Sequence, residues 1–328
     1  MMNKPNKIMF MTMLMLSVML SVSSNSWFMV WMGMEMNIMS FIPMILNINM
    51  TSKESAMTYF MIQAIASMLL IMSMILMKTK LMNNEIKSIM LMSALMMKSG
   101  IAPFHFWLPK TMEGMSWNMC LILMTVQKMI PLMIMSNLMK MNVFTMLSMT
   151  MSIIVGAMGG LTQTSLRKLM AYSSIMNNGW MMMAMMSSEI MWIIYFIMYT
   201  MMTTIMIKMM NNYKIYHLNQ LMSMNETLNK KMIMMLNILS MSGLPPFLGF
   251  LPKWLTIQPM INMSNLLTLS LVVMMTLIAL YYYLRIMYSV LMLSTSELNW
   301  NKKKMKNKWI MMMLPLSMMG LMLITLMY

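Results

Sequence analysis

Five ionisable side chains lie inside stretches of sequence that are otherwise apolar. They are Glu35, Lys98, Lys128, Lys253 and His105. A charge at the centre of a membrane helix costs about 2.5–3.5 kcal/mol on the insertion scale. The one glutamate and three lysines together would therefore oppose insertion by about 10–14 kcal/mol unless they are paired or hydrated. We expect these groups to face the interior of a helix bundle, in contact with one another or with water.

The chemistry that suits such residues is proton transfer. Burial disfavours the ammonium form of a lysine, so a buried lysine can release its proton near neutral pH, whereas a nearby carboxylate favours the ammonium. A change in the Glu35–Lys98 interaction would then make Lys98 bind or release a proton, which a relay through Lys128 and Lys253 would carry onward. Two structural alternatives stay open: Glu35 and Lys98 as an ion pair that only stabilises the fold, and Lys253 reaching towards the membrane surface.

His105 lies beside a proline in its span and either shuttles protons near neutral pH or packs as a hydrogen-bonded core residue. Neither of the two histidines has a second ligand nearby in sequence, so no metal site is predicted. The sequence has no glycine-rich nucleotide motif and a single cysteine. We therefore expect no cofactor in this chain: a nicotinamide, a flavin or an iron–sulfur cluster would have to be bound elsewhere.

The amino-acid composition indicates which kind of structural element must carry these ionisable side chains. Of 328 residues, 60% are hydrophobic and 9% are charged, and the mean hydropathy is +0.70. These values exclude a soluble globular enzyme and a disordered chain. The apolar runs last about 20 residues, which is too long for the strands of an outer-membrane barrel. The 72 methionines replace other apolar side chains and indicate a coding bias.

Eleven apolar segments approach membrane-spanning length. They cover residues 7–22, 26–46, 55–77, 86–108, 116–137, 143–160, 165–186, 189–210, 231–258, 264–289 and 309–327. The sequence thus predicts an all-α polytopic membrane protein of about eleven transmembrane helices, forming one domain over residues 1–328. The formal net charge of +16 does not indicate nucleic-acid binding, because the basic residues lie between the apolar segments.

An internal repeat divides this domain. Residues 99–110 (SGIAPFHFWLPK) and 242–253 (SGLPPFLGFLPK) align without a gap and match at seven of twelve positions. Each copy carries glycine and proline residues that interrupt a helix. The copies lie five spans apart and therefore cross the membrane in opposite directions. This arrangement predicts an inverted repeat with two discontinuous helices, in which repeat one covers about 7–137 and repeat two about 143–289, followed by a final helix.

The distribution of lysine and arginine predicts the topology. With eleven spans, 15 of these residues fall on the side that holds the N-terminus. Four fall on the other side, namely Lys78, Lys80, Lys87 and Lys140. Positive charge stays on the side of synthesis, so the N-terminus is predicted there and the C-terminus opposite.

Five motifs carry a resemblance to a known family. They are GMEMNIMSFIP (33–43), KSGIAPFHFWLP (98–109), TVQKMIPL (125–132), GGLTQTSLRKLMAYSSI (159–175) and GLPPFLGFLPKW (243–254). In this order they resemble the mitochondrially encoded chain 2 family of NADH:ubiquinone oxidoreductase (respiratory complex I), and the insect members are the most alike. The methionine excess fits the insect mitochondrial code.

The resemblance implies an antiporter-like fold with two inverted five-helix units. By motif match it implies that Glu35 is the coupling glutamate, Lys98 its partner, Lys128 the central lysine and Lys253 the lysine on the exit side. It also implies that NADH, FMN, iron–sulfur clusters and ubiquinone are bound by other subunits.

The function implied is that of a membrane-arm subunit of a proton-translocating enzyme. Its partners would be chains 3, 4, 4L and 6, accessory subunits and phospholipids such as cardiolipin. It would lie in the mitochondrial inner membrane with its N-terminus in the matrix and its C-terminus towards the intermembrane space. A stand-alone cation/proton antiporter and a non-pumping scaffold of the membrane arm remain alternatives.

Overall fold

The computed structural model describes residues 4–46, 49–79, 83–223, 228–262 and 266–292. Regular structure within these ranges is helical, and the single β-type contact among them is one isolated bridge between Ser165 and His217. The chain divides into two compact units, one up to Ser148 and one from Met149 onward. The prediction of one domain made of two repeats stays a prediction.

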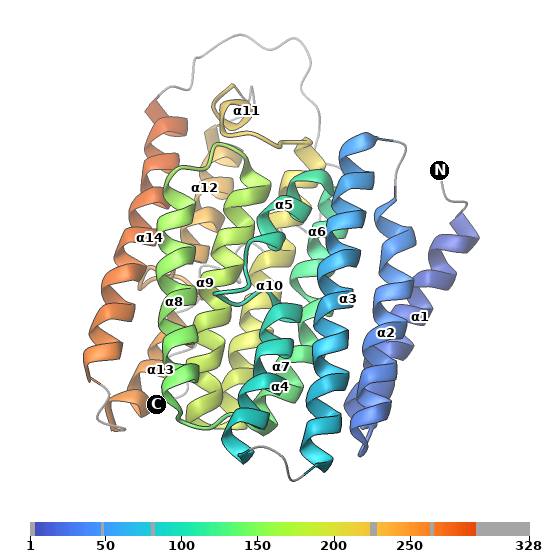
Figure 1. Ribbon diagram of the computed structural model, residues 1–328. Helices are drawn as coiled ribbons and strands as arrows, with labels where there is room; N and C mark the ends of the chain where they lie inside the picture. The colour runs from blue at the N-terminus through green and yellow to red at the C-terminus, as the bar shows by residue number, and fades with distance from the viewer. Residues whose placement is uncertain (1–3, 47–48, 80–82, 224–227, 263–265, 293–328) are drawn as a thin grey trace. The chain divides into compact units, whose positions relative to one another are not determined.

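Eight described helices begin in the first unit, and the last of them, α8, continues into the second. They are α1 (Lys4–Ser23), α2 (Trp27–Ile45), α3 (Met50–Lys78), α4 (Asn84–Ser99), α5 (Trp107–Gly114), α6 (Trp117–Met124) and α7 (Val126–Leu138), followed by α8 (Val143–Leu161). The long helix α3 packs along both α4 and α5, and α7 packs against α4 (Figure 1).

The remaining helices belong to the second unit. They are α9 (Leu166–Ser187), α10 (Glu189–Tyr213), α11 (Leu218–Met222), α12 (Leu228–Ser242), α13 (Phe250–Asn262) and α14 (Leu266–Met292). Helix α10 contacts α9, α12 and α13, and α14 packs against α12 and α13 (Figure 1).

The helices agree with ten of the eleven predicted segments, and segment 309–327 lies outside the described residues. Seven described helical stretches are long and apolar enough to span a membrane. The segments at 86–108 and 231–258 miss this criterion because a connection of several residues divides each into two short helices, whereas α6 and α7 are separated by one residue and count as one stretch. Helix α9 misses it because buried polar residues, among them Asn177 and Asn178, lower its hydropathy.

Serines inside these apolar helices are satisfied locally. Ser152 donates to the carbonyl of Met149 at 2.7 Å, and Ser173 donates to that of Met170 at 2.7 Å. A hydroxyl that bonds to a carbonyl three residues earlier needs no partner from another helix. Such serines therefore add small side chains to helix contacts without leaving polar groups exposed to lipid.

The first predicted interruption forms between α4 and α5. Helix α4 ends at Ser99, and Gly100 follows in the left-handed region at φ 73°. Glycine adopts this conformation without the steric cost of a side chain and commonly ends helices. The amides of Gly100 and Ile101 both donate to the carbonyl of Met96, which closes the helix end. The connecting segment contains a cis peptide bond before Pro103.

The second interruption repeats this local geometry between α12 and α13. Gly243 follows Ser242 at φ 82°, and the segment up to Gly249 separates the two helices. A methyl group on Gly249 would lie 1.9 Å from the carbonyl oxygen of Ser240. Glycine is therefore required there so that the connecting segment can approach the backbone of α12. Both discontinuous helices predicted from the repeated motif are present.

A third interruption was not predicted. Segment 116–137 was expected to form one helix, but it divides at Thr125 into α6 and α7. The hydroxyl of Thr125 donates to the carbonyl of Leu121 at 2.7 Å. Pro131, which cannot donate to the carbonyl of Gln127, lies inside α7. The helix therefore breaks one to two turns before this proline.

Candidate functional site

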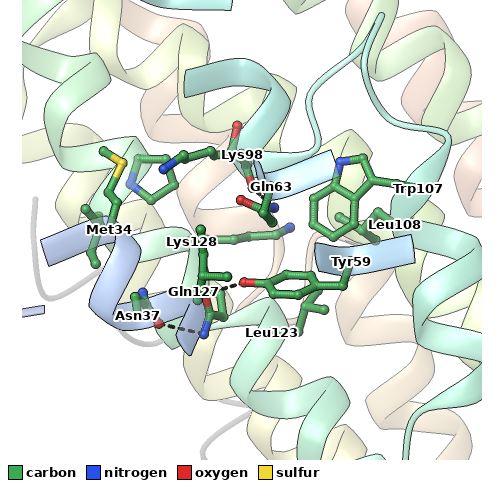
Figure 2. A pocket seen from close by; sticks show the side chains of 14 residues that line it. Met34, Asn37, Tyr59, Gln63, Lys98, Trp107, Leu108, Leu123, Gln127 and Lys128 are labelled. Atoms are coloured by element: carbon green, nitrogen blue, oxygen red, sulfur yellow. Dashed lines mark hydrogen bonds between the residues drawn. The ribbon is translucent and has the colours of Figure 1, made fainter. Parts of the chain in front are cut away.

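A cavity in the first unit brings together two of the predicted lysines. Lys98 and Lys128 are only 7% and 2% exposed, and both line this cavity together with Tyr59, Gln63 and Trp107 (Figure 2). The cavity offers about 20 Å³ to the centre of a water molecule, and about 10–15 Å³ is enough for one water. Two buried lysines, one from α4 and one from α7, therefore line the same small cavity, which has room for water.

A chain of hydrogen bonds forms one wall of the cavity. The hydroxyl of Tyr59 donates to Gln127 Oε1 at 3.1 Å, and Gln127 Nε2 donates to Asn37 Oδ1 at 2.7 Å. Figure 2 shows Gln127 between these two partners. The chain joins α3, α7 and α2. Because Gln127 precedes Lys128, it fixes the position of the backbone that carries the lysine.

The broken end of α4 is closed by neutral donors. The indole Nε1 of Trp107 donates to the carbonyl of Met97 at 3.1 Å, and Gln63 Nε2 donates to that of Lys98 at 3.3 Å. These bonds satisfy carbonyls that the interrupted helix leaves without intrahelical partners. The C-terminal end of a helix carries partial negative charge, and Lys98 lies in the last turn of α4.

Glu35 and Lys98 do not form a direct hydrogen bond. Lys98 Nζ and Glu35 Oε1 are both buried and have no hydrogen-bond partner. The carboxylate of Glu35, which is half-buried on α2, is nevertheless close enough for its charge to act on Lys98 and on Tyr59. The direct contact that the sequence suggested is therefore not made, and water can supply the hydrogen bond that each of the two atoms lacks.

Lys253 lies in the second unit and is buried at 6% exposure. Its Nζ donates to the carbonyl of Ser242 at 2.7 Å and lies 5.9 Å from the ring centroid of Trp180. The lysine on α13 therefore closes the broken end of α12. It does not reach towards the membrane surface, which was the alternative that the sequence left open.

His105 is buried within the first interruption, but it is not among the residues that line the cavity. Its ring packs on Phe106 with centroids 4.1 Å apart, and its Nδ1 has no hydrogen-bond partner. A proton-shuttling role for His105 stays a prediction. Among the described residues, no three His, Cys, Asp or Glu side chains gather as a metal site would require.

Several neighbours of the lysines were missed in the sequence. Tyr59, Gln63, Asn37 and Gln127 are polar residues in apolar spans, and that property alone could have marked them. The charge count also placed Lys87 at a membrane end, whereas the structure buries it at 4% exposure, with its Nζ donating to the carbonyl of Thr79.

With this geometry described, comparisons with known proteins give the family. The sequence profile of the family described as NADH:quinone oxidoreductase/Mrp antiporter, transmembrane, matches residues 24–279. That range includes both interrupted helices and all the buried lysines described above. The chain belongs to this family.

Individual members agree with the match over nearly the whole length. NADH-ubiquinone oxidoreductase chain 2 of Anopheles gambiae is 45% identical over 312 residues, covering 92% of this chain and 91% of the relative. The chain 2 of Locusta migratoria is 43% identical over 326 residues, covering 98% and 95%. The resemblance to the insect members of this family, predicted from five motifs, is confirmed.

Solved structures share the fold at lower identity. Respiratory complex I from Thermus thermophilus with bound aureothin contains a chain with a TM-score of 0.84 and 20% identity, covering 99% of this chain and 78% of that chain. The Mrp complex from Dietzia gives a TM-score of 0.78 at 14% identity, covering 86% and 60%. An antiporter-like fold is therefore established for this member of the family.

Proposed function

We propose that this chain is a membrane-arm subunit of proton-translocating NADH:ubiquinone oxidoreductase. Its close relatives are chain 2 of that enzyme over almost their entire length. The observation that carries a role in proton movement is the cavity of the first unit, where two buried lysines meet in a space large enough for water. Such a subunit is a multi-pass protein of the mitochondrial inner membrane.

The relay begins at Glu35. Oxidation of NADH and reduction of ubiquinone elsewhere in the complex change the interaction between Glu35 and Lys98. Since the two groups make no direct hydrogen bond, a small movement of α2 or a change in the carboxylate's charge alters the affinity of Lys98 for its proton. Lys98 then passes the proton through the shared cavity to Lys128.

Lys253 receives the proton after Lys128 and is the lysine on the exit side of the pathway. Each proton moved uphill requires about 2.3 kcal/mol per 100 mV of membrane potential. A buried charge interaction that is made or broken supplies energy of that order. The proton leaves towards the intermembrane space, with the N-terminus of this chain in the matrix and its C-terminus on the opposite side.

The same proposal covers the finer architecture and the partners. The chain has eleven transmembrane helices in two inverted repeats. No redox centre resides in it; NADH, FMN, the iron–sulfur clusters and ubiquinone bind to other subunits. Its neighbours are chains 3, 4, 4L and 6, accessory subunits and phospholipids such as cardiolipin.

A second candidate is a stand-alone cation/proton antiporter. The likeness to a chain of the Dietzia Mrp complex favours it. Such a protein would exchange sodium or potassium for protons in vesicles without NADH oxidation. A third candidate, a non-pumping scaffold of the membrane arm, would keep the same proton stoichiometry after neutralisation of Glu35 and Lys98.

The first experiment is gentle solubilisation of the source membranes, separation on a native gel and identification of this chain by mass spectrometry. We expect it to migrate in a very large assembly that has NADH:ubiquinone reductase activity. Migration as a small particle without that activity would exclude the subunit and leave the antiporter.

A further inference from the structure

The surroundings of Lys253 differ in kind from those of the other buried lysines. Its ammonium group is held by elements from three helices of one unit: the Ser242 carbonyl that ends α12, the face of Trp180 on α9, and its own helix α13. Trp180 is 1% exposed. The lysine and the indole are therefore both removed from solvent.

No carboxylate is available to balance this charge within the described part of the second unit. The only acidic residue there is Glu189, which is exposed at the start of α10. The cation is stabilised instead by a carbonyl oxygen, by the partial negative charge at the end of α12 and by the π-face of an indole, which is the best aromatic partner for an ammonium.

The orientation of Trp180 supports a role for its ring face. Its Nε1 is buried and has no hydrogen-bond partner, although leaving a buried donor unpaired costs about 1–3 kcal/mol. Hydrogen bonding of the indole therefore does not determine its position. Gly243 also leaves space for the cation, since a methyl group there would lie 2.9 Å from Lys253 Nζ.

The first interruption is closed without any cation. There, Trp107 donates its indole N–H to the carbonyl of Met97, and the repeat mate of Lys253, Lys110, is exposed. A tryptophan thus accompanies each break, but it acts as a neutral donor at one and presents its face to an ammonium at the other. Within the described residues, a lysine ammonium donates to the broken helix end only at the second break.

We propose that Trp180 is a positioning residue for proton transfer: its ring holds protonated Lys253 against the broken end of α12, and release of the proton frees both groups. This inference rests on the proposed function and adds a residue to it. Replacing the indole by an aliphatic side chain removes this stabilisation of the ammonium. The loss corresponds to about a tenfold change in the ratio of protonated to deprotonated Lys253.

The test is a series of variants in the assembled complex, reconstituted into vesicles and assayed for protons moved per electron pair. We expect the ratio to fall in the order wild type, Trp180→Phe, Trp180→Leu, with Trp180→Leu approaching Lys253→Met. Trp192→Leu is the matched control, because Trp192 on α10 is 3% exposed, also has an unpartnered Nε1 and packs on Phe196. Its ratio should match the wild type.

The outcomes separate the two proposals. An unchanged ratio in Lys253→Met would refute transfer through Lys253 and with it that part of the proposed function. A reduced ratio in Lys253→Met together with wild-type ratios in both Trp180 variants would overturn only the role of Trp180. If Trp180→Leu fails to assemble, Trp180→Phe decides: a ratio between those of wild type and Lys253→Met supports the inference, and a wild-type ratio overturns it.

Discussion

Replacing Lys128 by methionine tests whether this lysine serves proton transfer or only stabilises the protein. Lys128 is 2% exposed on α7 and lines the same cavity as Lys98. Methionine keeps an unbranched side chain of similar length and removes the ammonium group. The variant should therefore fill the space that the lysine occupies without supplying a proton-binding site.

The expected magnitudes follow from the burial of the lysine. A lysine at the centre of a membrane helix costs about 2.5–3.5 kcal/mol on the insertion scale, and water in the cavity reduces that cost. Lys128→Met should therefore leave the free energy of unfolding unchanged or raise it by up to about 2.5 kcal/mol. Proton transfer should fall instead, because Lys98 loses the acceptor with which it shares the cavity.

The assay measures protons moved per electron pair in vesicles that contain the purified complex, alongside the thermal midpoint of complex dissociation. Lys110→Met is the matched control, because Lys110 lies on α5 and is exposed. We expect Lys128→Met to assemble, to withstand heat at least as well as the wild type and to move fewer protons. An intact complex with an unchanged proton ratio would refute the relay, and a complex that falls apart would show that the lysine is structural.

Three further variants test other parts of the site. Gly249→Ala should reduce the amount of assembled complex on a native gel several-fold, because the added methyl group would lie 1.9 Å from the Ser240 carbonyl oxygen; normal assembly would contradict the packing of the second break. Glu35→Gln should leave NADH oxidation in leaky membranes intact but lower proton uptake per electron in sealed ones, because Lys98 loses the charge that acts on it; a wild-type ratio would favour the scaffold. Gln127→Leu removes two hydrogen bonds and should cost about 1–2 kcal/mol in a thermal dissociation assay, and a stability equal to that of the wild type would mean that the bonds are not both made.

Much of the architecture could be predicted because a membrane admits few backbone structures. Apolar length identifies helices, and glycine with proline in a repeated motif identifies interruptions, since both effects depend on the local chain alone. The conformations of Gly100 and Gly243 follow from this local chemistry. The charged residues within the predicted spans could also be identified as candidates for a functional site, because charged side chains are rare inside membranes and usually have a function there.

The sequence could not predict the division at Thr125 or the burial of Lys87. Pro131 marked a weak point in its helix, but the neighbours that pack on the helix determine where it bends. Lys87 counted as a surface charge, yet it is buried on α4 and donates to the carbonyl of Thr79, the residue that caps the end of α3. Both features depend on contacts between segments, which a hydropathy pattern does not contain.

The ionisable residues within the spans, and the helices that carry them, could be identified from the sequence alone. The tertiary structure decided which partners each lysine meets: Gln127 joins residues 68 and 90 positions away, and Trp180 meets a lysine on another helix. The physical reason is that spacing along one helix predicts which residues share a face, whereas the packing of several helices determines which side chains come together in a cavity.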